Sequence, residues 1–435
     1  MKLPNIPKGT RDFSSIEMSK RNYLIQAIRE KFELFGFCPI ETPSFEKIST
    51  LVGKYGEEGD YLMFKLLHSG NVLKKISNKA LRYDLTVPFV RYVVMHKNEI
   101  VFPFKRYQIQ PVWRSDKPQK GRFREFYQCD ADIISSSWSL WEEIELIQLC
   151  DEIFTKLNFP IIIYINHRDI LGGLVEISGI KNNLWKDFTT SLDKWNKIGR
   201  DLVKKEMLSK GISSQSFDKI AFFFDMKDSF SKKEKHLTVA FQYSKKGKKG
   251  IKDLSFIYQN IKRISLQNTK LEWNISLARG MNYYTGTILE IVPFHNLISI
   301  GGGGRYDQLA NLFGMKNIYG VGVSLGLDRI YLAMEKKNLF QTIPSKVLFI
   351  NFGDEEVLYA YKMVKFLRKK GISTQLYPHA VKIGKQFRYA NDNNIPFTIS
   401  IGKNEIKRNK IRVKNLKERT EKEYDNINDV VNQLI

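Results

Sequence analysis

The segment from Trp113 to Ile133, WRSDKPQKGRFREFYQCDADI, constrains the fold more than any other stretch of the chain. Two arginine-bearing flanks alternate polar and apolar residues around a basic loop that contains a proline and a glycine. This pattern predicts two neighbouring strands, with Arg114 on the face that also carries some of Arg124, Phe126 and Gln128. Such a face could hold a phosphate, stack on a base and bind a small polar molecule. An ordinary solvated hairpin is the alternative.

The positive charge of the chain is concentrated in two segments. The 435 residues carry a net charge of +24. Residues 181–270 hold 21 Lys and Arg against 9 Asp and Glu, and residues 345–435 hold 18 against 10. Segments of this kind suit a polyanion such as nucleic acid, although lysines also simply solvate a surface.

Length and composition limit the class of protein. A chain of this length predicts two or three domains, and 43% hydrophobic with 27% charged residues is ordinary for a soluble globular protein. The sequence has no run of 18 apolar residues, no apolar N-terminal signal region, and three cysteines without metal-ligand spacing. We therefore expect a cytoplasmic protein with no membrane partner.

The N-terminal segment predicts a long helix followed by an extended stretch. Ser14 and Glu17 have the spacing of a capping box, apolar residues recur at helical spacing over residues 23–35, and Gly36 is a typical stop. Residues 37–45 carry two prolines that limit strand pairing. The helix and the stretch together suit a subunit interface, and an ordinary core helix fits the same pattern.

Residues 81–88, LRYDLTVP, predict a strand with alternating polar residues. Arg82, Asp84 and Thr86 would share one face, because side chains two apart in a strand point the same way. A carboxylate beside a hydroxyl suits the ammonium group of a ligand. A plain surface strand is the alternative.

The middle of the chain is predicted to be mainly helical. A strand over residues 104–112 leads into the hairpin, and residues 141–157 predict a helix. Residues 174–261 are helical in parts and rich in lysine, which indicates an inserted subdomain. Its run KKGKKG, residues 245–250, is expected to be an exposed loop.

Three glycine-bearing motifs follow this insertion. ARGMNYYTG, residues 278–286, precedes a predicted strand over residues 287–292, and four glycines, residues 301–304, follow an apolar strand. These glycines indicate special backbone angles or a ligand against the backbone, and a flexible hinge is the alternative. Residues 320–330 predict a strand that runs into a helix near Arg329. A dinucleotide-binding site is excluded, because its βαβ unit and acidic residue are missing.

The periodicity changes after a predicted linker at residues 341–345. Strands and helices then alternate, which indicates a compact α/β domain of about 90 residues. The expected strands are residues 346–352, 372–377, 397–401 and 406–413, and the expected helices are residues 355–370, 384–391 and 427–434.

These motifs resemble those of the histidyl-tRNA synthetases, a family of class II aminoacyl-tRNA synthetases. The helix with its proline-bearing stretch, the arginine hairpin, and the glycine-spaced strand with its arginine are similar to motifs one, two and three of the class. ARGMNYYTGT and GGGGRYD are similar to the two signature peptides of the family. PKGTRDF, LRYDLTVPF, GRFREFYQCDADI and the C-terminal IGKQFRYANDNNIPFTISIG extend the resemblance over essentially the whole chain.

The resemblance implies a reaction with ATP and residues that carry it. A histidine carboxylate would attack the α-phosphorus, so positive charge is needed where negative charge develops. Arg114 would bind the α-phosphate and Arg329 the γ-phosphate. Arg279 would touch both the histidine carboxylate and the α-phosphate, so Arg279 and Arg114 are the expected catalytic residues. Phe126 would stack on adenine, Asp116 would lie near its edge, and Mg²⁺ would accompany the β- and γ-phosphates.

The resemblance also implies a pocket for L-histidine. Its expected residues are Asp84, Thr86, Gln128, Asp132, Arg279, Tyr283 and Tyr284. Asp84 and Thr86 would take the α-amino group with Gln128 beside them. Asp132 and Tyr284 would bind the two imidazole nitrogens, which would reject isosteres lacking these groups.

For tRNA(His), the resemblance implies two regions of contact. Gln119 and Arg122 in the hairpin loop would lie on the acceptor stem, and the C-terminal domain would read the anticodon. Asn282 stands where the family usually has Asp, and Asp132 where many members have Glu. LRYDLT replaces the Arg-Pro-Glu-Gly-Thr version of many bacterial members. These departures bear on fine specificity rather than on the reaction.

Two other functions remain to be weighed. A histidine-binding regulatory paralogue of ATP phosphoribosyltransferase would charge no tRNA, but such proteins typically lack the anticodon domain and the ATP-binding arginines. This chain has Arg114, Arg279, Arg329 and the C-terminal domain. A non-catalytic RNA-binding protein would explain the basic segments but not the clustered Asp84, Gln128, Asp132 and Tyr284.

We therefore expect an α+β fold, in which an antiparallel sheet flanked by helices forms the catalytic domain. The expected divisions are residues 1–170 and 266–340 for the catalytic domain, 171–265 for a basic, mainly helical insertion, and 345–435 for an α/β anticodon-binding domain. The expected partners are L-histidine, ATP, tRNA(His) and a second copy in a homodimer.

Overall fold

The chain folds into two units, Met1–Leu339 and Phe340–Ile435. The computed structural model describes residues 4–67, 76–278, 283–294, 298–340 and 347–434. The predicted linker at residues 341–345 lies outside the described residues.

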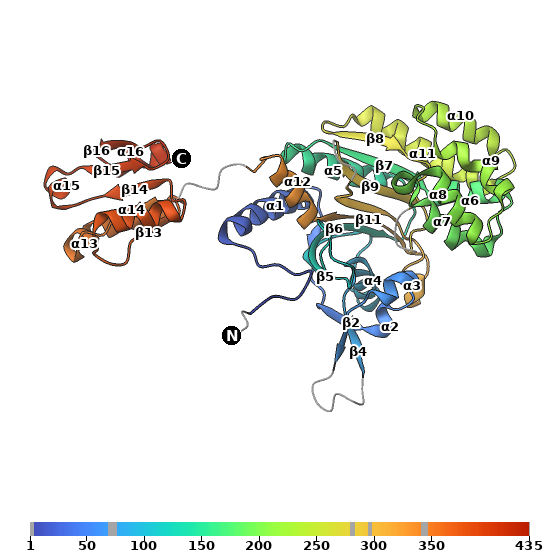
Figure 1. Cartoon of the computed structure of the whole chain (residues 1–435), viewed down its shortest axis with the longest axis horizontal. Helices are drawn as coiled ribbons and strands as arrows, with labels where there is room; N and C mark the ends of the chain where they lie inside the picture. Colours follow the sequence, from blue (N-terminus) through green and yellow to red (C-terminus); the bar gives the residue numbers. More distant parts are fainter. Residues whose placement is uncertain (1–3, 68–75, 279–282, 295–297, 341–346, 435) are drawn as a thin grey trace. The chain divides into compact units, whose positions relative to one another are not determined.

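A mixed sheet of eight strands forms the centre of the first unit (Figure 1). Along the sheet the strands are β1 (Cys38–Pro39), β5 (Phe104–Trp113), β6 (Glu125–Ser135), β11 (Tyr319–Gly326), β10 (Gly301–Arg305), β9 (Thr287–Pro293), β7 (Ile161–His167) and β8 (Thr269–Trp273). Only the outer strands β1 and β8 pair in parallel with their neighbours. The expected antiparallel sheet, the hairpin and the strand after the first signature peptide are confirmed.

Helices cover both faces of this sheet. On one face, α12 (Leu327–Lys336) and α5 (Trp141–Lys156) contact the central strands, and α1 (Ser15–Leu34) packs on both helices. The predicted capping box starts α1, since the Ser14 amide donates to Glu17 Oε2 at 2.7 Å and Ser14 Oγ accepts from the Glu17 amide at 3.3 Å. In the described ranges, no helix is both long and apolar enough to cross a membrane.

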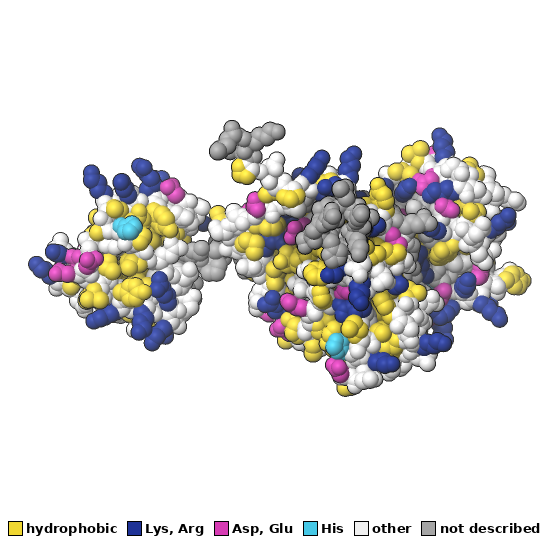
Figure 2. Space-filling view, turned by 90° about the horizontal axis from the view of Figure 1, so that it is seen from below, with side chains coloured by type: hydrophobic (Ala, Val, Ile, Leu, Met, Phe, Trp, Pro, Cys, Tyr) yellow, Lys and Arg dark blue, Asp and Glu magenta, His cyan; other side chains and the backbone are white. Residues whose placement is uncertain are grey.

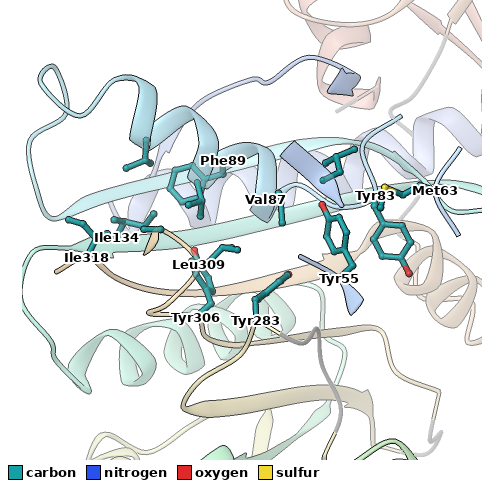
Figure 3. Close-up of a cluster of buried hydrophobic side chains, with 14 of the residues drawn as sticks. Tyr55, Met63, Tyr83, Val87, Phe89, Ile134, Tyr283, Tyr306, Leu309 and Ile318 are labelled. Carbon is teal, nitrogen blue, oxygen red and sulfur yellow. The ribbon is translucent and has the colours of Figure 1, made fainter. Parts of the chain in front are cut away.

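A smaller layer lies on the opposite face. It contains α4 (Thr86–Met95), α2 (Ile48–Leu51), α3 (Gly56–Tyr61) and a three-stranded sheet in the order β2 (Phe45–Lys47), β4 (Ile76–Leu81) and β3 (Lys65–Leu67). Buried residues of α4, among them Val87 and Phe89, pack against Ile134 of β6 and against Tyr283 and Tyr306 (Figure 3).

The predicted strand over residues 81–88 is wrong. The chain leaves β4 at Leu81, turns through residues 82–85 and enters α4 at Thr86. Two side chains stabilise this turn: Arg82 donates to the carbonyl oxygens of Thr42 (2.7 Å) and Pro111 (2.8 Å), and Asp84 accepts from the Val87 amide at 3.1 Å. The proline at position 88 then falls in the first turn of α4, where no intrahelical donor is needed.

The middle of the chain is helical, as the sequence predicts. The helices are α6 (Arg168–Ser178), the 3₁₀ turn η1 (Asn182–Leu184), α7 (Trp185–Leu192), α8 (Trp195–Ser209), α9 (Ser214–Phe224), α10 (Phe230–Ala240) and α11 (Lys245–Ile264). The division of the first unit into catalytic parts and an insertion remains a prediction.

The expected loop KKGKKG is instead the first part of α11. Its lysines are exposed, but Gly247 and Gly250 are buried against α6. A Cβ added to Gly173 of α6 would lie 2.7 Å from Gly247 Cα, and one added to Gly250 would lie 2.8 Å from Ile170 Cγ1. The glycines therefore allow α6 and α11 to cross with their backbones in contact. In the sequence, the same glycines and lysines have the pattern of a loop, because the packing partner lies far away along the chain.

The four glycines form β10 itself rather than following a strand. A Cβ on Gly303 would collide with the carbonyl oxygen of Gly322 on β11, and one on Gly304 would collide with that of Thr287 on β9. Gly304 also has a φ of +156°. The two expected reasons for glycine, a special backbone angle and a close approach to the backbone, therefore both apply. The atoms that come close to these glycines belong to the backbones of the neighbouring strands β9 and β11.

The second unit is an α/β domain with a five-stranded sheet in the order β13-β12-β14-β15-β16. Its elements are β12 (Val347–Phe349), α13 (Asp354–Lys369), β13 (Thr374–Leu376), α14 (Ile383–Asp392), β14 (Phe397–Ser400), α15 (Lys403–Arg408), β15 (Ile411–Asn415), β16 (Thr420–Tyr424) and α16 (Ile427–Leu434). The strand expected over residues 406–413 is partly wrong. The Gly402 amide donates to Glu405 Oε2 at 3.0 Å and starts a helical turn, and Asn409, with a φ of 52°, ends it before β15.

Candidate active site

One face of β6 carries a row of polar side chains. Phe126, Gln128, Asp130 and Asp132 share this face, because successive side chains of a strand alternate. The register places Val112, Gln110, Gln108 and Arg106 of β5 opposite them, in that order. On the other side, Ser324 of β11 lies opposite Asp130, and Gly322 opposite Asp132.

Asp132 is held by three neighbours. Its Oδ2 lies 2.8 Å from Nη2 of Arg106, which is fully buried, and its Oδ1 accepts from the Tyr306 hydroxyl at 2.5 Å. A Cβ on Gly322 would collide with Oδ1, so only glycine leaves room for this carboxylate. Burial raises the pKa of Asp132, and the charge of Arg106 opposes that shift.

Asp84 is surrounded by hydrogen-bond donors at the start of α4. It accepts from the hydroxyls of Tyr55 (2.8 Å) and Tyr283 (3.0 Å) and from the Val87 amide. A side-chain hydrogen bond also joins Thr86 to Tyr283. Burial raises the pKa of Asp84, while these bonds and the charge of Arg114 lower it. The structure therefore brings the predicted Asp84, Thr86 and Tyr283 together.

Tyr284 lies beside the same cluster. Its ring centroid is 5.0 Å from that of Tyr283, and a Cβ on Gly304 would lie 2.9 Å from its Cδ1. Burial and the nearby charges of Asp132, Asp130 and Asp84 raise the pKa of Tyr284. A neutral phenol thus sits next to buried carboxylates, above a strand of glycines.

Arg114 and Phe126 lie at the end of the row where β5 and β6 enter the loop. The guanidinium of Arg114 is 4.4 Å from the ring centroid of Tyr83 and 5.2 Å from that of Phe126, and its Nε donates to the Tyr83 carbonyl at 3.0 Å. Arg114 as a residue is partly exposed. An aromatic face and a cation are therefore side by side, next to the buried carboxylates.

Arg329 reaches the same end of the sheet from α12. Its Nε donates to the Gly121 carbonyl at 3.0 Å and its Nη1 to the Ser299 carbonyl at 2.9 Å. In the hairpin loop, Asp116 is buried and pairs with Arg122 at 2.7 Å, and the backbones of Arg122 and Gln119 are hydrogen-bonded. Gln119 itself is exposed.

Asp328 ties the N-terminal motif PKGTRDF to this region. Arg11 of the motif and Arg21 of α1 both form ion pairs with its carboxylate. Asp328 Oδ2 also accepts from the Tyr127 amide of β6 at 2.8 Å. A motif more than 300 residues away in sequence therefore fixes the start of α12 against the hairpin.

The described part of the chain does not include every expected site residue, and its pocket contains residues that the sequence did not predict. Arg279 and Asn282 lie outside the described residues. The sequence reasoning missed Arg106, Tyr55, Tyr306 and Asp130 as pocket residues. For Asp130 the alternation of β6 was a sufficient signal, since it lies between Gln128 and Asp132 on one face. Tyr306 lies in the signature peptide GGGGRYD, which was a signal for it. Arg106 and Tyr55 come from distant segments, and no local pattern marks them.

The described residues contain no group of three or more His, Cys, Asp or Glu side chains that could hold a metal ion.

The first unit combines a largely antiparallel sheet flanked by helices with an arginine-bearing hairpin. The hairpin lies beside a strand-to-helix junction that carries a second arginine. This combination defines a class II aminoacyl-tRNA synthetase. The family described as histidyl-tRNA synthetase matches residues 9–330, and the family described as anticodon binding domain matches residues 346–435. The chain therefore belongs to the histidyl-tRNA synthetase family.

Individual relatives agree with this assignment. The chain is 52% identical to the histidine–tRNA ligase of Christiangramia forsetii and 51% identical to that of Flavobacterium johnsoniae, with 95% of each chain covered in both cases. The crystal structure of histidyl-tRNA synthetase from Nostoc sp. PCC 7120 matches with a TM-score of 0.86 at 30% identity, over 100% of both chains. A Bacillus halodurans protein described as an ATP phosphoribosyltransferase regulatory subunit/histidyl-tRNA synthetase shares the fold alone, at 19% identity and a TM-score of 0.73.

Proposed function

We propose that this chain attaches L-histidine to tRNA(His) through a histidyl-adenylate, releasing pyrophosphate and then AMP. One observation carries the proposal. Asp130 and Asp132 share the face of β6 with Phe126, buried tyrosines of other segments surround the carboxylates, and the guanidinium of Arg114 lies 5.2 Å from the Phe126 ring. An adenylate needs these three parts, which are an aromatic surface for the base, a cation for the phosphate and a polar pocket for the amino acid.

In the first step two anions must meet, the histidine carboxylate and the α-phosphate of ATP. Arg114 would bind the α-phosphate while Phe126 stacks on adenine and Asp116 lies near its edge. Arg329 would bind the γ-phosphate, and Arg279 would bridge the carboxylate and the α-phosphate. Fixed guanidinium groups stabilise the charge that develops at phosphorus without reorganising water. Mg²⁺ would neutralise the β- and γ-phosphates.

The pocket would recognise histidine through complementary hydrogen bonds. Neutral imidazole has one donor and one acceptor nitrogen. Asp132, fixed by Arg106 and Tyr306, would accept from the first, and the phenol of Tyr284 would donate to the second. Asp84, Thr86 and Gln128 would take the α-ammonium group, and Tyr283 would hold Asp84 in place.

In the second step a ribose hydroxyl at the 3′ end of tRNA would attack the adenylate. Gln119 and Arg122, on the exposed hairpin loop, would contact the acceptor stem. The second unit would read the anticodon, and Lys and Arg side chains are spread over its visible face as over that of the first (Figure 2). Residues 171–265 would act as an insertion within the catalytic domain, 1–170 and 266–340.

Three further expectations complete the proposal. A second copy would pair through α1 and the short edge strand β1, where Cys38 and Pro39 are exposed. Sedimentation equilibrium would then give twice the chain mass of 50.8 kDa. The protein would work in the cytoplasm without a membrane partner.

The decisive experiment is ATP–pyrophosphate exchange with each amino acid in turn, followed by charging of tRNA(His). Exchange with histidine alone is expected. Histidine binding without exchange would instead support a regulatory paralogue, and exchange with another amino acid would refute the proposal.

A further inference from the structure

The N-terminal segment, residues 7–13 with the sequence PKGTRDF, packs against the hairpin that carries expected ATP-binding residues. The carbonyl oxygen of Gly9 accepts from the Arg124 amide at 2.8 Å, and that of Lys8 accepts from Arg124 Nη1 at 3.4 Å. A Cβ added to Gly9 would lie 2.8 Å from Arg124 Cγ and 3.0 Å from Pro118 Cγ. Gly9 also has a φ of +90°, which favours glycine. Close contact and backbone angle therefore both require glycine where the segment meets the hairpin.

Arg124 links the N-terminal segment to two residues of the expected ATP site. Its Nε donates to the carbonyl oxygen of Asp116 at 3.2 Å, and its own carbonyl oxygen accepts from the Arg114 amide at 2.9 Å. Asp116 is expected near the adenine edge and Arg114 at the α-phosphate. A shift of the segment would therefore move both groups through Arg124.

Arg11 connects the same segment to the second arginine of the expected ATP site. Its guanidinium lies 3.4 Å from the ring centroid of Phe123 in the hairpin and forms an ion pair with Asp328 at the start of α12. Asp328 is buried and directly precedes Arg329, the residue expected at the γ-phosphate. Arg329 Nε donates in turn to the Gly121 carbonyl of the hairpin loop at 3.0 Å. These contacts hold the start of α12 and the hairpin loop in one arrangement.

The expected histidine pocket is held by other groups. Asp132 is fixed by Arg106 and Tyr306, and the hydroxyls of Tyr55 and Tyr283 donate to Asp84. These side chains lie on β5, on β6 and in segments far from the N-terminal segment in sequence. A displacement of the N-terminal segment should therefore change the binding of ATP and leave the binding of histidine unaffected.

We propose that residues 7–13 form a positioning segment for the ATP-binding groups of the active site. Gly9 acts through Arg124 on the adenine and α-phosphate end of the site. Arg11 acts through Asp328 on the γ-phosphate end. This inference rests on the proposed function, and it gives a role to the motif PKGTRDF, to which the proposed function assigns none.

The first test compares Gly9→Ala with Gly211→Ala in the full chain. Gly211 also has a φ of +90°, but within the described residues a Cβ there would meet no atom closer than 4 Å. The two substitutions therefore strain the backbone alike, and only Gly9→Ala presses on the hairpin. In histidine-dependent ATP–pyrophosphate exchange, Gly9→Ala should raise KM for ATP about 10- to 100-fold, since a misplacement of about 1 Å can cost about 100-fold. It should leave KM for histidine within about 2-fold, and Gly211→Ala should leave both values unchanged.

The second test uses Arg11→Met and Arg11→Lys. Arg11→Met removes the charge, and the fold should persist because Asp328 keeps its ion pair with Arg21. This variant should raise KM for ATP about 10-fold and leave Ki for AMP, which lacks the γ-phosphate, within about 2-fold. Arg11→Lys restores a cation beside Asp328 and should return KM for ATP to within about 3-fold of the value of the unmodified chain. Gly9→Ala, in contrast, should weaken AMP as well, because AMP keeps the adenine and the α-phosphate.

An unchanged KM for ATP in Gly9→Ala or in Arg11→Met would overturn the inference. So would an equal rise of KM for histidine, which a general loosening of the fold would produce. An equal loss of ATP and AMP affinity in Arg11→Met would exclude the action of Arg11 on the γ-phosphate end. Absence of histidine-dependent exchange in the unmodified chain would instead refute the proposed function.

Discussion

Replacing Gly322 by alanine tests whether the pocket depends on the close approach of β11 to Asp132. The added methyl would collide with Asp132 Oδ1 and lie 2.5 Å from its Cγ. Asp132 cannot turn away without losing Arg106 or Tyr306. Overpacking of this kind costs about 1–3 kcal/mol, and a displaced charge-assisted hydrogen bond to the ligand about 1.5–3 kcal/mol.

These magnitudes translate into two measurements. With an unfolding entropy of about 2.1 cal/mol/K per residue, a loss of about 2 kcal/mol should lower the Tm of the first unit by about 3 °C. The KM for histidine in ATP–pyrophosphate exchange should rise about 10- to 100-fold. The KM for ATP should stay within about 2-fold, because Arg114 and Phe126 lie at the other end of the row.

A double-mutant cycle isolates the cause. Asp132→Ala leaves Arg106 buried without its partner, which costs about 3–5 kcal/mol. It also removes the atoms that the methyl at Gly322 would meet, except the Ala131 carbonyl at 3.1 Å. The double variant should therefore match Asp132→Ala within about 0.5 kcal/mol. The reasoning would be refuted if the free-energy changes of the two single substitutions simply add in the double variant. It would also be refuted if Gly322→Ala binds histidine with full affinity.

Three further predictions follow from other parts of the chain. Gly173→Ala should lower the Tm of the first unit while its neighbour Gly172→Ala leaves it unchanged or slightly higher. Only the former places a Cβ against the backbone of α11, so their stabilities should differ by about 1–3 kcal/mol by thermal unfolding. Burial raises the pKa of Asp130 from 3.8 to about 8, despite the opposing charge of Arg106, so the unfolded state loses its proton first and stability falls as pH rises between these values. Urea titrations should therefore show Asp130→Asn gaining stability relative to the unmodified chain from pH 4 to 8, and a constant difference would contradict this. Arg279→Ala should cut histidine-dependent exchange about 10²- to 10³-fold with an unchanged Tm, and unchanged exchange would remove its assigned role.

Local patterns predicted most of the elements correctly. Alternation gave β5 and β6 with the shared face of Phe126 and Gln128, and helical spacing gave α1 and α5. The capping pair Ser14 and Glu17 marked the start of α1. These predictions succeed because the period of a strand or helix and the chemistry of a cap are set by residues that are neighbours in sequence.

The errors have one physical origin. Residues 81–88 alternate like a strand, but Arg82 and Asp84 bind backbone groups and turn the chain into α4. The run KKGKKG resembles a loop, but its glycines let α11 pack on α6. In both cases distant backbone decides the conformation, and no local pattern records it.

The sequence by itself determined the family resemblance, the strand faces and the presence of carboxylates, arginines and tyrosines in the expected motifs. Only the tertiary structure decided which of these groups are paired. Tyr283 reaches Asp84 across 199 positions, and Tyr306 reaches Asp132 across 174. Asp130 has the same residue type and strand face as Asp132, but its neighbour on β11 is Ser324, which offers one hydroxyl and no charge. The reason is that the cost of a buried charge depends on donors supplied by other segments, which the period of a strand cannot encode.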